Sequence, residues 1–483
     1  MTFSFLRILT YVLGLVGTSL LLPLGIAVWK DETEMVPVFL VPMLLGWGVA
    51  AAFWLLARKR PRVFDVQHAF GTVGGIWIAI CLFGALPLHF SGCFPSFTDA
   101  VFESVSGFTT TGASVLSDVE CLPRSVNLWR CETHWLGGLG VIALAVALIP
   151  LLGIGGFRLI KAETTGPDKA KLTSLIANTA KTLWFIYMAL TVAQALLLWH
   201  AGLDAVDAVA HAFSTMGTGG FSTRNASVGA FGLPAAEWIC TAFMLAASVN
   251  FTLYYRLLTG RLGDVVRDSE LRTFVALVLG AVAVATAVEC RSWEGFGAML
   301  RAVAFQVSSV VSTTGFMTDD YLAWRPAAQV VILLLFFIGG CSGSTSGGIK
   351  VIRWTILGKQ LRNELRRILH PHEMFTLSIN GCACREAFVP VVASFVFVYM
   401  LLVLVTTFAG ALAGLDVFTA FTGALSMVGN VGPAFGALGP TSNYGALAAP
   451  LKWFYMFAML AGRLEIYTLL ILVGRVCFIR RTA

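Results

Sequence analysis

Long uncharged apolar runs, separated by short polar or basic loops, dominate this chain. A run of about 20 apolar residues can cross a bilayer as a helix, because each residue adds about 1.5 Å. The runs are continuous and do not alternate as barrel strands do. They predict an all-α polytopic membrane protein with ten full spans, at 5–29, 36–57, 69–90, 132–154, 181–201, 233–257, 272–290, 326–357, 387–412 and 449–477.

The composition narrows the class of protein further. Hydrophobic residues make up 57% of the 483 residues and charged residues 12%, about half the share in a soluble domain. These values exclude a soluble globular protein, a disordered chain, a coiled coil and a small disulfide scaffold. Arg7 precedes a first run that is long for a signal peptide and has no cleavage pattern after it, so we expect a retained first span.

Every second loop between the predicted spans is basic, and the formal net charge is +7. Lys and Arg gather at 58–62, 158–181, 256–272, 350–367 and 475–481. Because cytoplasmic loops carry the excess of Lys and Arg, this alternation places those loops and both termini inside the cell. The basic segments are not part of an aromatic-rich domain, so we expect no nucleic acid partner.

Four shorter segments lie between spans on the predicted outer side, and they form an internal repeat. Each has about twelve helix-compatible residues and then a glycine, with a serine six residues before it: Ser106, Ser214, Ser309 and Ser426. We call the four residues that end on each glycine the filter strings. They are Thr109-Thr110-Thr111-Gly112, Gly217-Thr218-Gly219-Gly220, Ser312-Thr313-Thr314-Gly315 and Gly429-Asn430-Val431-Gly432.

The repeat divides the chain into two N-terminal spans and four pseudo-symmetric span–pore loop–span units, as in a potassium channel. The boundaries are 1–65 for the two helices, then 66–165, 166–265, 266–385 (with an interrupted second helix) and 386–483.

A segment of twelve helical residues is too short to span, so we expect each unit to contain a re-entrant loop. Non-helical backbone at membrane depth must be buried in protein or line water. Four such loops around one axis would form a ring of carbonyl oxygens that can replace the hydration shell of a cation. The strings carry no carboxylate, which favours a monovalent ion. Simple loop tips between spans are the alternative interpretation.

Three motifs, together with the four repeats, closely resemble the membrane subunit of the Trk type in the Trk/Ktr potassium uptake superfamily. They are Gly343-Ser344-Thr345-Ser346-Gly347-Gly348-Ile349-Lys350-Val351-Ile352-Arg353, Gly462-Arg463-Leu464-Glu465 and Asn430-Val431-Gly432-Pro433. The resemblance covers the whole chain, and Ser346 departs from it where many members have glycine.

The resemblance implies potassium uptake across a bacterial inner membrane, with K⁺ as the bound and transported ion at the filter strings and no covalent cofactor. It also implies a homodimer and a cytosolic, nucleotide-binding regulatory subunit of the TrkA kind. A symporter that couples potassium to H⁺ or Na⁺ is the alternative. An enzyme is not expected, because no catalytic motif stands in a suitable setting.

Span 326–357 is interrupted by a small polar run, which we call the gate segment: Gly340, Cys341, Ser342, Gly343, Ser344, Thr345, Ser346, Gly347 and Gly348. Such a run is a poor helix, and its backbone would be costly in lipid. We expect it to face a water-filled cavity below the third filter string and to act as a movable constriction. A static glycine-rich crossing is the alternative.

Arg463 lies near the middle of the last predicted span. Burial at the bilayer centre is costly for Arg, so it should face the interior. It is expected either to act as an electrostatic barrier or to bind carbonyls of the gate segment; an ion pair with Glu465 or Glu103 is the alternative. Lys452, on the same span, is expected to extend to the membrane interface.

Smaller signals leave alternatives open. Basic residues at 350–367 could dock a partner or bind anionic membrane lipids, or could reflect orientation alone. Cys93, Cys121 and Cys131 lie on the predicted outer side, where a disulfide is conceivable. His211 aligns with Glu103 in the repeat, and we expect a polar contact there rather than a metal site.

Overall fold

The computed structural model describes residues 3–57, 66–152, 169–290, 295–370, 376–383 and 388–464. Apart from a two-stranded hairpin, its regular elements are helices, as predicted. The first half contains α1 (Phe3–Ser19), α2 (Leu21–Trp29), η1 (Thr33–Met35), α3 (Val36–Ala57), α4 (Val66–Phe90), α5 (Phe97–Phe108), α6 (Arg124–Leu152), α8 (Lys169–His200), α9 (Ala205–Gly217), η2 (Ser227–Phe231), α10 (Pro234–Ser248) and α11 (Phe251–Leu258). The second half contains α12 (Leu262–Val266), α13 (Ser269–Glu289), α14 (Phe296–Val311), η3 (Tyr321–Ala323), α15 (Pro326–Leu335), α16 (Val351–Leu369), β1 (Ser378–Ile379), β2 (Cys382–Ala383), α17 (Phe388–Leu412), α18 (Val417–Gly429), η4 (Gly436–Leu438) and α19 (Ala449–Arg463).

Six helical stretches among the described residues are long and apolar enough to cross a membrane. A seventh is present if α10 and α11, which meet at an angle of 94°, form one broken span. The predicted span 326–357 is divided between α15 and α16, and predicted spans 132–154 and 449–477 extend beyond the residues whose side chains are described. The structure thus shows a membrane protein with many apolar helices, and the count of ten stays a prediction.

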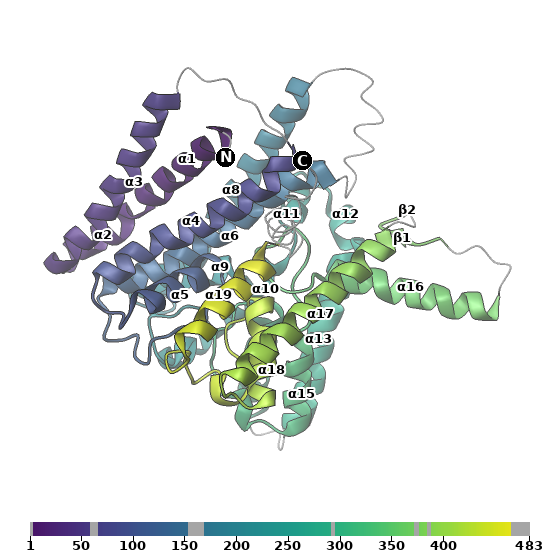
Figure 1. Ribbon diagram of the computed structural model, residues 1–483. Coiled ribbons are helices and arrows are strands. Elements are labelled where there is room, and N and C mark those ends of the chain that lie inside the picture. Colours follow the sequence, from purple (N-terminus) through teal and green to yellow (C-terminus); the bar gives the residue numbers. More distant parts are fainter. Residues whose placement is uncertain are drawn as a thin grey trace.

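Four helices of 12 to 16 residues, α5, α9, α14 and α18, lead into the filter strings. Figure 1 shows α5, α9 and α18 within the helical bundle. Each packs against the helix that precedes it and the helix that follows it in the chain. Polar side chains begin three of them: Ser96 Oγ accepts from Asp99 N, Asp204 from Val206 N, and Asp416 from Phe418 N. Such N-caps satisfy backbone donors that the first turn leaves open. The short helices therefore start where the sequence provides a cap and end at the filter strings.

One large apolar core joins most of the molecule. The N-terminal helix α1 packs on α3 and α4, beside the rest of the bundle. Helix α16 extends away from the bundle (Figure 1). The turn of the hairpin β1–β2 instead contacts the start of α13, where Asn380 Nδ2 donates to Asp268 Oδ2 at 2.8 Å. The four filter strings lie in the interior of this arrangement, since all of their residues are buried or half-buried.

Candidate ion pathway

The filter strings share one backbone conformation. The second residue of each string has a positive φ, at 54° for Thr110, 55° for Thr218, 55° for Thr313 and 54° for Asn430. The final glycines also have positive φ, from 78° at Gly112 to 98° at Gly432. Left-handed geometry is unfavourable for a threonine. Its recurrence at four equivalent positions therefore indicates a conformation imposed by the surrounding structure.

Hydrogen bonds hold this conformation in the same way in every string. The N–H of the third residue donates to the carbonyl oxygen of the serine that precedes the glycine by six residues. The pairs are Thr111–Ser106 and Gly219–Ser214 at 2.8 Å, Thr314–Ser309 at 2.9 Å and Val431–Ser426 at 3.0 Å. The serines therefore mark the point where each short helix closes onto its string.

The four glycines lie next to one another in a closed ring. A Cβ placed on Gly112 would overlap the carbonyl oxygen of Gly219 in the second string. The same overlap links Gly220 to Thr314 O, Gly315 to Val431 O, and Gly432 to Thr111 O. Each glycine thus faces the third residue of the next string, and the fourth string returns to the first. Glycine is required at these points because any side chain would strike the neighbouring backbone.

Most filter-string residues are buried, whereas Gly112, Gly220 and Gly315 are half-buried. Hydroxyl pairs lie within two of the strings, with Thr109 Oγ1 and Thr111 Oγ1 2.8 Å apart and Ser312 Oγ and Thr314 Oγ1 2.7 Å apart. Asn430 Nδ2 donates to Thr111 Oγ1 at 2.9 Å and so joins the fourth string to the first. Hydrogen bonds between side chains therefore stabilise the strings and join the fourth string to the first.

The gate segment lies against the ring and contacts several units. Gly347 N donates to Thr313 Oγ1 at 2.7 Å, and Gly347 also lies close to the backbone of Gly429. Thr345 Oγ1 donates to Met216 O at 3.0 Å. The segment therefore meets strings two, three and four at their helix ends.

Arg463 ends α19 and is buried, with 6% of its surface exposed. It donates to Thr345 O at 2.6 Å and, at 3.4 Å, to Gly137 O. Arg463 therefore binds a backbone carbonyl of the gate segment, which is one of the partners considered from the sequence. Glu103 is occupied by another cation, and Glu465 lies outside the described residues.

A buried ion pair behind the first two strings escaped the sequence analysis. Arg130 on α6 contacts Glu103 on α5 at 2.6 Å, and both side chains are almost fully buried. Glu103 also accepts from Ser114 Oγ and Val115 N, just after the first string. Arg130 lies over the ring of Phe221, just after the second string, at 4.3 Å. The available signal was one acidic and one basic side chain in segments that carry few charges.

His134, also on α6, links the same two strings. Its Nδ1 lies 2.8 Å from Gly107 O, and Phe221 N donates to its Nε2 at 3.2 Å. This pattern requires a neutral ring with the proton on Nδ1. The sequence around His134 does not indicate that this side chain joins two filter strings.

The structure also bears on the expectations for Lys452, for the three cysteines and for His211. Lys452 does not extend to the interface: it is buried and forms an ion pair with Asp99 at 2.7 Å, because the start of α5 packs beside α19. Cys93, Cys121 and Cys131 are free thiols. His211 makes the expected polar contacts, at 2.7 Å to Asp207 O and at 2.9 Å to Ser222 Oγ.

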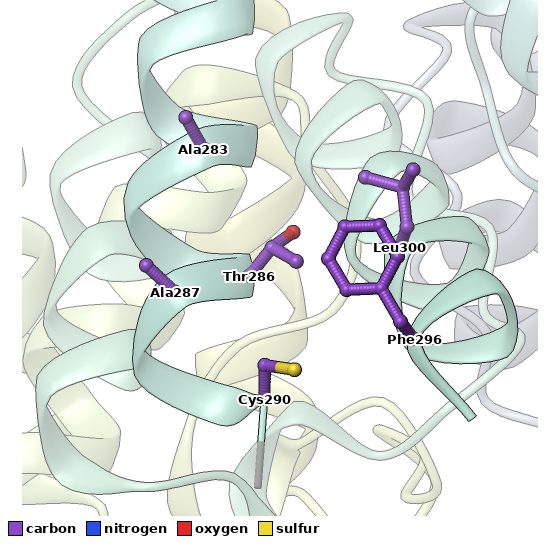
Figure 2. A pocket seen from close by; sticks show the side chains of 6 residues that line it. All are labelled: Ala283, Thr286, Ala287, Cys290, Phe296 and Leu300. Atoms are coloured by element: carbon purple, nitrogen blue, oxygen red, sulfur yellow. The ribbon is translucent and has the colours of Figure 1, made fainter. Parts of the chain in front are cut away.

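A separate cavity of about 340 Å³ lies between α13 and α14 (Figure 2). Small side chains of α13 leave the space, and aromatic and aliphatic side chains of α14 close the opposite wall. Its lining residues are Ala283, Thr286, Ala287, Cys290, Phe296 and Leu300. No filter-string or gate-segment residue lines it, so this cavity is not part of the candidate pathway.

Comparisons with known proteins show which family the chain resembles in sequence and in structure. Residues 43–476 match the family model described as TrkH, cation transport protein. The chain is 38% identical to the Trk system potassium uptake protein TrkH of Salmonella typhimurium over 477 residues, which cover 96% of this chain and 98% of that protein. It is 35% identical to the Trk system potassium uptake protein TrkG of Escherichia coli, with 98% of each covered.

Among solved structures, the crystal structure of the potassium transporter TrkH from Vibrio parahaemolyticus matches with a TM-score of 0.89. The two chains are 34% identical, and the match covers 99% of this chain and 100% of that one. The similarity therefore extends over nearly the whole chain. The chain is a multi-pass membrane transport protein, not an enzyme, and it belongs to the TrkH family of cation transport proteins.

Proposed function

We propose that this protein takes up potassium ions through the ring of four filter strings. The observation that carries the proposal is the cyclic contact of the four glycines, each against the next string. A ring of backbone carbonyls on four re-entrant loops can replace the water shell of a K⁺ ion. The relatives named as potassium uptake proteins support K⁺ as the cargo.

The gate segment and Arg463 would control passage below the ring. The segment contacts the helix ends of strings two, three and four, and Arg463 adds a buried positive charge beside Thr345 O. A fixed cation near a pore opposes cation entry by electrostatic repulsion. Conduction then requires that the segment and the charge move aside together.

The finer architecture follows from the same proposal. Four span–pore loop–span units after two N-terminal helices, ten spans and cytoplasmic termini agree with the packing of each short helix between its two neighbours and with the alternating loop charge. The homodimer and a cytosolic, TrkA-like nucleotide-binding regulatory subunit are part of this proposal. Localisation in the bacterial inner membrane fits the bacterial relatives.

Helix α16 is suited to the membrane surface. Leu361, Leu365 and Ile368 form an exposed apolar stripe, and Lys359, Arg362 and Arg366 lie on another face of the same helix. An amphipathic basic helix of this kind binds anionic lipid headgroups. We assign that role to α16 in the membrane.

The membrane potential alone can drive uptake. Each 100 mV contributes about 2.3 kcal/mol per charge, and a tenfold concentration ratio costs about 1.4 kcal/mol. A potential of 100 mV therefore supports about 1.6 decades of accumulation without a coupling ion. Coupling to H⁺ or Na⁺ is the alternative mechanism.

Rubidium uptake into liposomes that contain only the purified protein tests this proposal. We expect influx driven by an imposed potential, inhibited by excess potassium but not by excess sodium. Influx that occurs only with a Na⁺ or H⁺ gradient would instead establish the symport alternative. No influx from protein that elutes as a single folded species would contradict both.

A further inference from the structure

The gate segment has a narrow neck, where the chain that enters it meets the chain that leaves it. Gly339 N donates to Ile349 O at 2.9 Å, and Val351 N donates to Gly340 O at 3.2 Å. These two bonds join the entry and the exit of the segment. Movement of residues 341–348 must therefore either break these two hydrogen bonds or move the bonded residues as well.

A carboxylate on another helix binds both sides of the neck. Glu270, in the first turn of α13, accepts a hydrogen bond from Ser342 N at 2.6 Å and another from Ile352 N at 3.2 Å, both at Oε1. Its side chain is buried, with 6% of the residue surface exposed. One oxygen thus ties the entry and the exit of the gate segment to α13.

The sequence at the start of α16 explains why a carboxylate from outside is needed. Ile352 lies in the first turn, where backbone N–H groups have no acceptor within the helix. The residue at the N-cap position is Lys350, whose ammonium group can only donate. A negative charge near a helix N-terminus is stabilised by the helix dipole, and N–H bonds to a charged oxygen are about twice as strong as neutral ones. Glu270 therefore acts as the cap that α16 lacks.

We propose that Glu270 is a positioning residue that latches the neck of the gate segment to α13 and so keeps the segment beneath the filter strings. This inference rests on the proposed gating function. The tip of the segment is held separately, by Arg463 at Thr345 O and by Thr313 Oγ1 at Gly347 N. Loss of the latch loosens the base of the segment, while the filter strings keep their own contacts.

The test compares basal rubidium uptake in liposomes for the parent chain, Glu270→Ala and Glu270→Gln. We expect Glu270→Ala to raise uptake by roughly tenfold, the factor that corresponds to about 1.4 kcal/mol. Glu270→Gln retains an acceptor oxygen without the charge and should give a smaller rise. Competition by potassium should be unchanged in both variants, because neither alters the ring.

A matched control is Glu237→Gln on α10. Glu237 is also a largely buried carboxylate, and it pairs with Arg301 at 2.7 Å instead of with the gate segment. Its replacement should leave basal uptake at the parent level. A rise equal to that of the Glu270 variants would show that any lost carboxylate loosens the protein, and the latch would be wrong.

Combination with a shortened gate segment separates the latch from the gate. In a chain with residues 343–348 shortened, Glu270→Ala should add no further uptake, because both changes act on the same closure. If shortening raises uptake but folded Glu270→Ala and Glu270→Gln do not, the latch is wrong and the gate stands. If neither shortening nor the Glu270 variants raise uptake, the gate itself is wrong. Should Glu270→Ala fail to fold, Glu270→Gln decides alone: unchanged uptake would overturn the latch.

Discussion

At the scale of single residues, the filter-string glycines meet two separate requirements. Gly112 has a φ of 78°, and a side chain there would strike the next string; Gly92 has a φ of 70° but open space around it. Alanine at either position would have to adopt the left-handed backbone conformation, which costs about 1–2 kcal/mol. Only Gly112→Ala also breaks the ring.

We therefore expect Gly112→Ala to abolish rubidium uptake per folded molecule and Gly92→Ala to retain it. Uptake into liposomes, normalised to the monodisperse fraction, measures the difference. Normal, potassium-inhibited uptake by Gly112→Ala would show that close approach in the ring is not needed for transport.

The ion pair between Glu103 and Arg130 predicts a stability effect. Removal of one partner of a buried pair leaves an uncompensated charge and costs about 3–5 kcal/mol. Arg130→Met should therefore lower the apparent thermal unfolding temperature strongly. Arg124→Gln removes a half-exposed partner of the buried Asp207, which keeps its contacts with Arg224 at 3.1 Å and Thr223 Oγ1 at 2.7 Å. The unfolding temperature should therefore change little. Equal shifts would contradict a special role for the buried pair.

Arg463 gives a third expectation at this scale. Arg463→Gln removes the charge next to Thr345 O, so basal rubidium uptake should increase. Arg463→Lys retains the charge and should keep uptake low. Loss of folded protein in both variants, without any increase in uptake, would favour a structural role over a barrier.

At the scale of elements, the gate segment is the most informative. Shortening residues 343–348 should raise basal rubidium uptake, because it removes the contacts with Met216 O and Thr313 Oγ1 that place the segment against the ring. Gly358→Ala on the adjacent α16, where an added methyl group meets open space, is the control and should have no effect. Unchanged uptake in a folded shortened chain would favour a static crossing.

Local signals explain why some elements were predictable. The short helices follow visible caps such as Ser96 and Asp416, and the small polar run between Leu335 and Val351 lies where the structure has no helix. The predicted span 233–257 missed a sharp bend. Asn250 caps α11 there, as its Oδ1 accepts from Thr252 N at 2.9 Å, and a helix-start residue inside an apolar run was the overlooked signal.

At the scale of the whole molecule, membership of a helical membrane transport family was predictable and is confirmed by the comparisons. The internal repeat also identified which glycines lie together. Contacts between distant segments were not predictable, because a single charge in an apolar span does not indicate its partner. Lys452 donates to Asp99, which lies 353 positions away in the chain, and Glu270 accepts from Ser342 N, which lies 72 positions away.

The most direct measurement is the position of rubidium in crystals of this protein, read from its anomalous scattering. If the four strings form the filter, rubidium should lie on the axis of the ring, among the backbone oxygens next to Gly112, Gly220, Gly315 and Gly432, and excess potassium should displace it. Rubidium bound elsewhere in the protein, with none in the ring, would contradict the proposed pathway.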